Sequence, residues 1–247
     1  MECYTVIAYG FVFLQVRTRF KDSHTFSIQN CRQMRSSLFY ALAIMALLGS
    51  FAGQCQSSGK AIQLFDGKTF RGWEGDTLNT WHIEDGAIVA GSSNKMVPHN
   101  DFLVTTRSYG NFILRLKFKL VGTEGFINAG VQFHSKRLAN PPYEMTGYQA
   151  DLGPKYWGSL YDESRRNKTL VQPDSMAIEK LLRPGEWNDY EVRSENRRIR
   201  ILLNGQQTVD YTETDQAIPQ SGLIGLQIHG GGKTKVYYKN IVLEEIH

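Results

Sequence analysis

The feature that most constrains the fold is a succession of short runs of alternating apolar and polar residues from residue 62 onward, separated by turn dipeptides. Asp85-Gly86 and Asn204-Gly205 each lie between two such runs, and these dipeptides readily adopt the positive φ angles of a tight β-hairpin. One short helix is predicted near residues 175–181, between two proline-containing turns. Roughly a dozen strands without β-α-β units predict an all-β sandwich or jelly roll.

One of the longer runs shows how a strand divides into two faces. Residues 111–121 alternate between an apolar face and a basic face that includes Lys117. Because side chains on a strand point alternately to opposite sides, the apolar face is expected to lie in the core. Residues 125–134 alternate in the same way, and we expect them to pair with this strand across a turn at 121–124.

Charge and cysteine content exclude several classes of function. Residues 61–247 contain 22 Lys and Arg against 22 Asp and Glu, so this part of the chain is neutral and lacks the basic surface that nucleic-acid binding requires. The three cysteines, Cys3, Cys31 and Cys55, all precede it. We therefore expect no nucleic-acid partner, and neither disulfides nor thiolate metal sites after residue 60.

The first 60 residues have the layout of an export signal. After Met34 come a basic residue, an apolar run and then small residues before Cys55, and the run is too short for an ordinary membrane-spanning helix. We interpret 1–33 as an over-extended start, 34–55 as a signal peptide with a lipobox-like end, 56–61 as a linker and 62–247 as one domain.

The signal predicts an exported protein, a periplasmic or cell-envelope lipoprotein whose only contact with a membrane is a lipid on Cys55. Gln54 occupies the position just before the cysteine, where lipoboxes usually have a small residue. Plain secretion with cleavage near Gly53 is the alternative. Either reading places the protein outside the cytoplasm.

The stretch 147–166, GYQADLGPKYWGSLYDESRR, indicates a carbohydrate site. It combines four aromatic side chains, three carboxylates and two arginines between Gly and Pro residues. A sugar needs aromatic faces on which to stack and charged or amide groups to hold its hydroxyls. Two alternatives are a solvated loop with aromatics packed beneath it, and a structural latch in which the carboxylates pair with the arginines.

Four predicted strands carry unusual polar faces, rich in amides and imidazoles. If they are neighbours, they form one hydrophilic surface beneath the loop 156–166; taken singly, each histidine is more often a structural residue. The polar residues of the four strands are Arg115 and Lys117; Asn128, Gln132 and His134; Gln149 and Asp151; and Gln227 and His229.

Six motifs in order along residues 62–247 resemble the 3-keto-disaccharide hydrolase domain family. They read LFDGKTFRGW at 64–73, WHIEDGAIV at 81–89, NAGVQFH at 128–134, GYQADLG at 147–153, EWNDYEV at 186–192 and GLIGLQIHG at 222–230. The resemblance implies a concanavalin-like jelly-roll β-sandwich. It also implies cleavage, by hydrolysis or elimination, of glycosides already oxidised at C3. Two positions differ from the family pattern: His134 stands where many relatives have arginine, and Gln149 where many have glutamate.

A ketone at C3 acidifies the C2 proton, so such a reaction needs a base, a group that stabilises the enolate oxygen and an acid for the leaving group. Asp151 is our first choice of base, with His134 and His229 as alternatives. Glu163 is the candidate acid, and Arg165 or Lys117 the candidate oxyanion stabiliser. The remaining candidate substrate-binding residues are Asn128, Gln132, Gln149, Tyr156, Trp157, Tyr161 and Gln227. Trp157 is alternatively a core residue.

Other chemistries find less support in the sequence. His134, His229 and Asp151 are suitable metal ligands, but no metal-binding spacing accompanies them, so we predict neither a metal nor a cofactor. The chain has no Gly-x-Ser-x-Gly elbow and no Glu-x-Asp-x-Glu run of the retaining glucanases. The competing hypothesis is a non-catalytic, lectin-like module that binds a small oligosaccharide or glycoside without cleaving it.

Overall fold

The computed structural model describes residues 3–9, 12–18 and 59–246, which fall into two separate units. In the first unit, β1 (Cys3–Tyr9) and β2 (Val12–Thr18) form an antiparallel pair. The predicted signal peptide, with Cys55, lies outside the described residues, so export and lipidation stay predictions. In the described part, no helix is both long enough and apolar enough to span a membrane.

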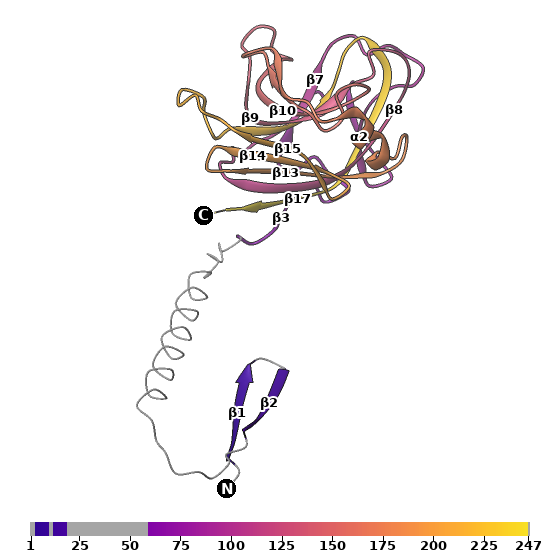
Figure 1. The fold of residues 1–247 in the computed structure, drawn as a ribbon. Helices are drawn as coiled ribbons and strands as arrows, with labels where there is room; N and C mark the ends of the chain where they lie inside the picture. Colours follow the sequence, from indigo (N-terminus) through magenta and orange to yellow (C-terminus); the bar gives the residue numbers. More distant parts are fainter. Residues whose placement is uncertain (1–2, 10–11, 19–58, 247) are drawn as a thin grey trace, which may run out of the picture. The chain divides into compact units, whose positions relative to one another are not determined.

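The second unit consists of two antiparallel sheets stacked face to face (Figure 1). The seven-stranded sheet contains, in spatial order, β12 (Lys168–Val171), β11 (Leu160–Glu163), β10 (Met145–Leu152), β9 (Ala129–Arg137), β16 (Leu223–Ile228), β7 (Asp101–Thr105) and β4 (Trp73–Glu74). The eight-stranded sheet contains β15 (Gln206–Thr212), β14 (Arg198–Leu203), β13 (Asn188–Glu195), β8 (Phe112–Gly125), β17 (Gly232–Glu245), β6 (Ala87–Gly91) and β5 (Trp81–Glu84), with β3 (Ile62–Gln63) beside β17. This arrangement confirms the predicted all-β jelly-roll sandwich.

Local turn and cap chemistry produces the hairpins and the helix that the sequence predicts. Asp85-Gly86 joins β5 to β6 and Asn204-Gly205 joins β14 to β15, and all four residues have positive φ angles. The helix α2 (Ser175–Leu181) begins after Asp174, whose carboxylate accepts a hydrogen bond of 2.9 Å from the backbone N–H of Ala177. This is an ordinary N-cap, which satisfies a free amide of the first turn.

The predicted hairpin between residues 111–121 and 125–134 is wrong. The strand β8 does not turn at 121–124; it continues to Gly125, where its last residues pair with β17. After Gly125 the chain crosses to the other sheet and begins β9. Both strands still bury their apolar faces in the core, but from opposite sheets.

Two buried tyrosines tie the sheets together beneath the central strands. The Tyr238 hydroxyl, from β17, donates to the backbone oxygens of Gly130 (3.0 Å) and Gln227 (2.9 Å). The Tyr190 hydroxyl, from β13, donates to the backbone oxygen of Asp151 at 3.2 Å. Each hydroxyl therefore finds a partner inside an apolar core, as a buried polar group must. Tyr238 connects β17 to β9 and β16, and Tyr190 connects β13 to β10.

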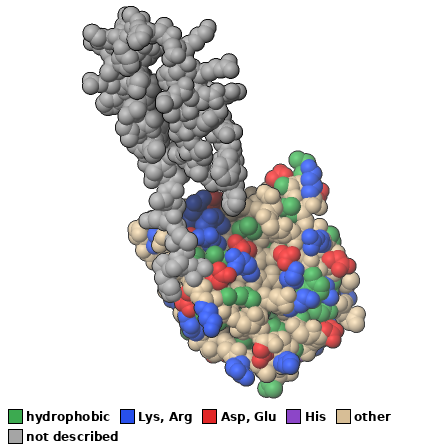
Figure 2. All heavy atoms as spheres, turned by 90° about the horizontal axis from the view of Figure 1, so that it is seen from below, with side chains coloured by type: hydrophobic (Ala, Val, Ile, Leu, Met, Phe, Trp, Pro, Cys, Tyr) green, Lys and Arg blue, Asp and Glu red, His purple; other side chains and the backbone are tan. Residues whose placement is uncertain are grey.

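Charged side chains of both signs are interspersed on the face of the second unit that Figure 2 shows. Several of them form ion pairs across neighbouring strands, such as Arg115 with Glu191 and with Glu244, each at 2.7 Å. The mixture agrees with the neutral composition of this part of the chain.

Candidate functional site

The strands β10, β9 and β16 are neighbours in the seven-stranded sheet, as the sequence predicts for three of the four polar strands. Gln149 on β10 lies opposite Gln132 on β9, and Gly130 lies opposite both Asp151 and Gln227. Tyr148 and Ala150 alternate with these residues and point into the core, so Gln149 and Asp151 point to the other face of the sheet. Amides and a carboxylate from three strands therefore meet on that face.

A small polar cavity of about 140 Å³ opens over this part of the sheet, and we call it the site cavity. Seven of the predicted site residues line it, from β10, β11 and the ends of the flanking loops. The lining residues are Phe126, Asn128, Gln149, Asp151, Tyr156, Tyr161, Glu163 and His229. Of these, Phe126 is missing from the sequence prediction, since a single aromatic residue between two strands gives no pattern that marks it as functional.

Asp151 is the most strongly held acid of the site cavity. Its Oδ1 atom accepts hydrogen bonds from Asn128 Nδ2 (2.8 Å), Leu152 N (3.0 Å) and Gln149 Nε2 (3.4 Å). Within residues 59–246, no group donates to Oδ2, which leaves this oxygen available to a ligand. Burial raises the pKa of Asp151 to about 7, against the three hydrogen bonds, which lower it.

Glu163 also lines the site cavity, but fewer hydrogen bonds stabilise its ionised form than that of Asp151. Gln227 Nε2 lies 3.5 Å from Glu163 Oε2, at the limit of a hydrogen bond. Burial raises the pKa of Glu163 to about 7, with further contributions from the negative charges of Glu144 and Asp151. Of the two acids, Asp151 thus has more hydrogen bonds that favour ionisation, and its negative charge helps to raise the pKa of Glu163.

A series of hydrogen bonds through two buried glutamine side chains orients Asp151. Ser135 Oγ donates to Gln132 Oε1 at 2.7 Å, and Gln132 Nε2 donates to Gln149 Oε1 at 3.1 Å. Gln149 then donates to Asp151, so its amide cannot flip without losing both contacts. Gln132 is fully buried and does not line the site cavity, so we assign it a supporting position rather than the predicted contact with substrate.

Aromatic side chains form the rim of the site cavity. The Phe126 ring lies edge-on to His229 at 4.6 Å and to Tyr156 at 6.0 Å between ring centroids, and Phe126 is 41% exposed. His229 Nδ1 lies 2.7 Å from the carbonyl oxygen of Gly230, which is the geometry of an N–H donor at Nδ1. In that tautomer the Nε2 atom of a neutral His229 is an acceptor.

His134 does not belong to the site, contrary to the prediction. A bulge in β9 gives His134 a positive φ of 47° and interrupts the alternation, so the ring packs against Phe112, Phe133 and Tyr148. Its Nε2 atom contacts the carbonyl oxygen of Gly110 at 3.0 Å. Burial lowers the pKa of His134 to about 4, so it is a neutral structural histidine at pH 7.

Arg165 is also a structural residue, in agreement with the latch alternative. It pairs with the fully buried carboxylate of Asp162 at 2.8 Å and lies over the Tyr148 ring. Arg166 pairs with Asp162 as well, and with Glu213 at 2.7 Å. The carboxylate of the latch is therefore Asp162, whereas its neighbour Glu163 points to the opposite face of β11 and into the site cavity.

Two further candidates lie elsewhere. Lys117 is on β8 in the other sheet and pairs with Asp189 at 2.5 Å, so its predicted place beside the other polar strands is wrong. Trp157 stacks on the core residue Phe118 with ring centroids 6.1 Å apart, which agrees with the alternative that Trp157 is a core residue. Gln227 is buried, does not line the site cavity and lies 3.5 Å from Glu163. Within the described residues, no group of three or more His, Cys, Asp or Glu is arranged to hold a metal ion.

Comparison with solved structures shows the same fold in proteins of low sequence identity. A proposed glycosyl hydrolase from Parabacteroides distasonis is 24% identical, with a TM-score of 0.56 over 76% of this chain and 94% of that chain. The carbohydrate-binding module CBM66 from Bacillus subtilis is 14% identical, with a TM-score of 0.54 over 70% of this chain and 96% of that chain. At these identities, the two comparisons establish a shared fold and nothing further. No curated protein matches the sequence.

Comparison with protein families gives a more specific result. The family whose pattern matches this sequence is described as a 3-keto-alpha-glucoside-1,2-lyase-like domain, and the match covers residues 60–244. This range contains both sheets and every residue of the site cavity. The chain therefore belongs to the family of 3-keto-alpha-glucoside-1,2-lyase-like domains.

Proposed function

We propose that this protein cleaves the glycosidic bond of glycosides that carry a ketone at C3, with Asp151 as base and Glu163 as acid. The observation that carries the proposal is the pairing of these two acids in one small polar cavity, both with a pKa near 7 but with unequal hydrogen bonding. Membership of the lyase-like family supports it. A purely structural role does not account for two carboxyl groups on one surface whose pKa burial raises so far.

In the proposed first step, ionised Asp151 removes the proton from C2, which the C3 ketone has made acidic. The electron pair of the C2–H bond forms the C2–C3 double bond of an enolate, and the ketone oxygen becomes negative. Tyr156 and Tyr161 line the cavity and offer hydroxyl donors for this oxygen. Burial and the charges of Glu163 and Asp151 raise the pKa of Tyr161, so it remains a neutral donor.

In the second step, the enolate electrons return to form a C1–C2 double bond, and the bond from C1 to the leaving oxygen breaks. Glu163 gives its proton to that oxygen. The products are a free alcohol or sugar and an unsaturated 3-keto sugar. Water that later adds across the double bond makes the net reaction a hydrolysis.

The proposal is tested by incubating the purified chain with a 3-keto-α-glucoside in D₂O. NMR then follows both the exchange of the C2 proton and the release of the leaving group. We expect Asp151→Asn to lower both rates by about 100-fold or more, the range of a lost general base. Binding without exchange or release, unchanged in Asp151→Asn, would instead identify a non-catalytic carbohydrate-binding module.

A further inference from the structure

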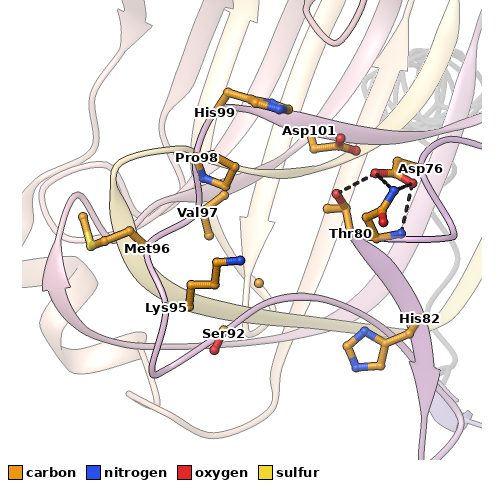
Figure 3. A pocket seen from close by; sticks show the side chains of 12 residues that line it. Asp76, Thr80, His82, Ser92, Lys95, Met96, Val97, Pro98, His99 and Asp101 are labelled. Carbon is orange, nitrogen blue, oxygen red and sulfur yellow. Dashed lines mark hydrogen bonds between the residues drawn. The ribbon is translucent and has the colours of Figure 1, made fainter.

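A second hollow of about 360 Å³ lies beside the site cavity (Figure 3). It is formed by residues 76–80 and the β5 strand that follows them, by the loop after β6 and by the start of β7. It is larger than the site cavity, which at about 140 Å³ is below the roughly 300–1,000 Å³ of ordinary small-molecule pockets. A disaccharide therefore does not fit within the site cavity alone. Part of such a substrate must lie outside it.

The two hollows share a thin wall of backbone. Residues 97–99 form one side of it and residues 229–231 the other, joined by hydrogen bonds between Val97 and the 231–232 turn at 2.8 and 2.9 Å. The backbones are so close that a Cβ atom on Gly230 would lie 2.6 Å from His99 Cα. His229 faces the site cavity and His99 faces the second hollow. A ligand in one hollow is thus separated from the other hollow only by these two backbone segments.

Exposed apolar side chains lie along the rim between the hollows. Phe126 belongs to the site cavity and Met96 to the second hollow, and each is 41% exposed. Met96 Cε stands 3.1 Å from the position of a Cβ on Gly125, next to Phe126. Tyr143, 38% exposed, stacks on His99 at 4.1 Å between ring centroids. An apolar rim of this kind provides surface for the carbon face of a sugar ring.

The interior of the second hollow supplies the complementary polar groups. Asp101 is 7% exposed, and Trp81 Nε1 donates to its Oδ1 at 2.6 Å. Among residues 59–246 no group donates to Asp101 Oδ2, whereas Asp76 is occupied by Asn79 and other groups of its own loop. Figure 3 shows Lys95 extending toward the space that these acids border. A carboxylate acceptor, an ammonium donor and an apolar side match an uncharged polyhydroxylated ring.

We propose that the second hollow binds the sugar that leaves, while the site cavity holds the oxidised ring. This inference rests on the proposed function, which it deepens by placing the leaving sugar of a 3-keto-disaccharide in a second, separate hollow. The glycosidic bond then crosses the rim at Phe126 and Met96, and the leaving sugar contacts Lys95 and Asp101.

The test measures binding, so that it does not depend on cleavage. The full-length chain carrying Asp151→Asn is titrated by calorimetry with 3-keto-maltose and with methyl 3-keto-α-glucoside, which lacks the second ring. We expect 3-keto-maltose to bind about tenfold or more tightly, from the added hydrogen bonds and apolar contact. Lys95→Ala, Met96→Ala and Asp101→Asn should each reduce this ratio about threefold or more and leave the methyl glycoside unaffected.

Two matched controls lie on the helix α2: Lys180→Ala for Lys95→Ala, and Met176→Ala for Met96→Ala. They should leave both affinities unchanged. Equal binding of the two ligands, or a ratio that survives all three variants, would overturn the inference even if the protein cleaves 3-keto-glycosides. If the ratio falls in the variants but the wild-type chain cleaves neither compound, the second hollow is a sugar subsite and the proposed reaction is wrong.

Discussion

The side chain of Gln149 lies directly over Gly130: a Cβ atom on Gly130 would stand 2.6 Å from Gln149 Cδ and 2.9 Å from its Nε2. The glycine therefore provides the space in which Gln149 connects Gln132 to Asp151. Because Gly130 does not have a positive φ angle, an alanine can adopt its backbone conformation.

We expect Gly130→Ala to displace the Gln149 amide from Asp151 while the fold is retained. The proposed reaction should slow by about tenfold, the cost of losing one hydrogen bond to a charged group. The melting temperature should change by no more than a few degrees, since a flexible side chain can move aside. Gly110→Ala is the control, because a Cβ atom on Gly110 would have its nearest neighbour at 3.9 Å, an ordinary contact distance. Unchanged turnover in Gly130→Ala would show that Gln149 does not orient the base.

Asp151→Asn should stabilise the protein, and more so as the pH rises. The folded protein raises the pKa of Asp151 from 3.8 to about 7, so the acid favours folding below pH 3.8 and loses that contribution as the pH rises through about 7. Asparagine keeps an oxygen for Asn128, Leu152 and Gln149 but has no charge. At about 1.4 kcal/mol per pKa unit, the gain at pH 8 reaches up to about 4 kcal/mol.

Urea unfolding at pH 4 and pH 8 measures this effect, with Asp85→Asn in the exposed β5–β6 turn as the control for the substitution itself. The variant and the wild type should be close in stability at pH 4 and diverge at pH 8. An Asp151→Asn variant that is less stable at pH 8 would mean that the ionised carboxylate is favoured by the fold.

The pH dependence of kcat/KM should be bell-shaped with its maximum near pH 7. Activity rises as Asp151 becomes the ionised base and falls as Glu163 loses the proton it must donate, and both carboxyl groups have a pKa of about 7. Because the two groups interact, the apparent pKa values of the two limbs belong to the pair of acids and not to either residue alone. Glu163→Gln should lower kcat about 100-fold and remove the descending limb. A descending limb that persists in this variant would identify a different acid.

The parts of the fold that local chemistry decides can be predicted from the sequence. Asp85-Gly86 and Asn204-Gly205 specify their hairpins whatever surrounds them, and Asp174 caps the helix within three residues. The pairing of β8 cannot be predicted in this way, because residues 121–125 alternate equally well in either sheet. Which sheet they join depends on the partner β17, more than a hundred residues later.

The same distinction applies to the site. Asp151 and His229 are predictable because strand alternation points them away from the core, and Glu163 because it belongs to the polar and aromatic stretch 147–166. His134 fails that argument because a bulge, invisible in the residue pattern, turns it back into the core. The role of Arg165 is left open by the sequence between a site residue and a latch, because the sequence does not reveal that the fully buried Asp162, and not Glu163, is the partner of the arginines.

His134→Asn should reduce stability without changing the pH profile of the reaction. Asparagine tolerates the positive φ of this position but loses the ring packing against Phe112, Phe133 and Tyr148, at a cost of about 1–3 kcal/mol. Turnover per folded molecule should stay within about threefold, since the residue lies outside the site cavity. A hundredfold loss of kcat with an intact fold would restore His134 as a candidate base.

Asp162 and Glu163 are consecutive carboxylates, and their substitution should have opposite effects on stability at pH 8. Asp162→Asn removes the buried charge that Arg165 and Arg166 share, which should cost about 3–5 kcal/mol. Glu163→Gln removes a charge that burial disfavours: the raised pKa means that the ionised acid destabilises the fold as the pH rises through about 7. This variant should equal or exceed the wild type in the free energy of unfolding, measured by urea denaturation. If both variants lose stability alike, Glu163 is part of the latch, and the site cavity then contains a single free acid.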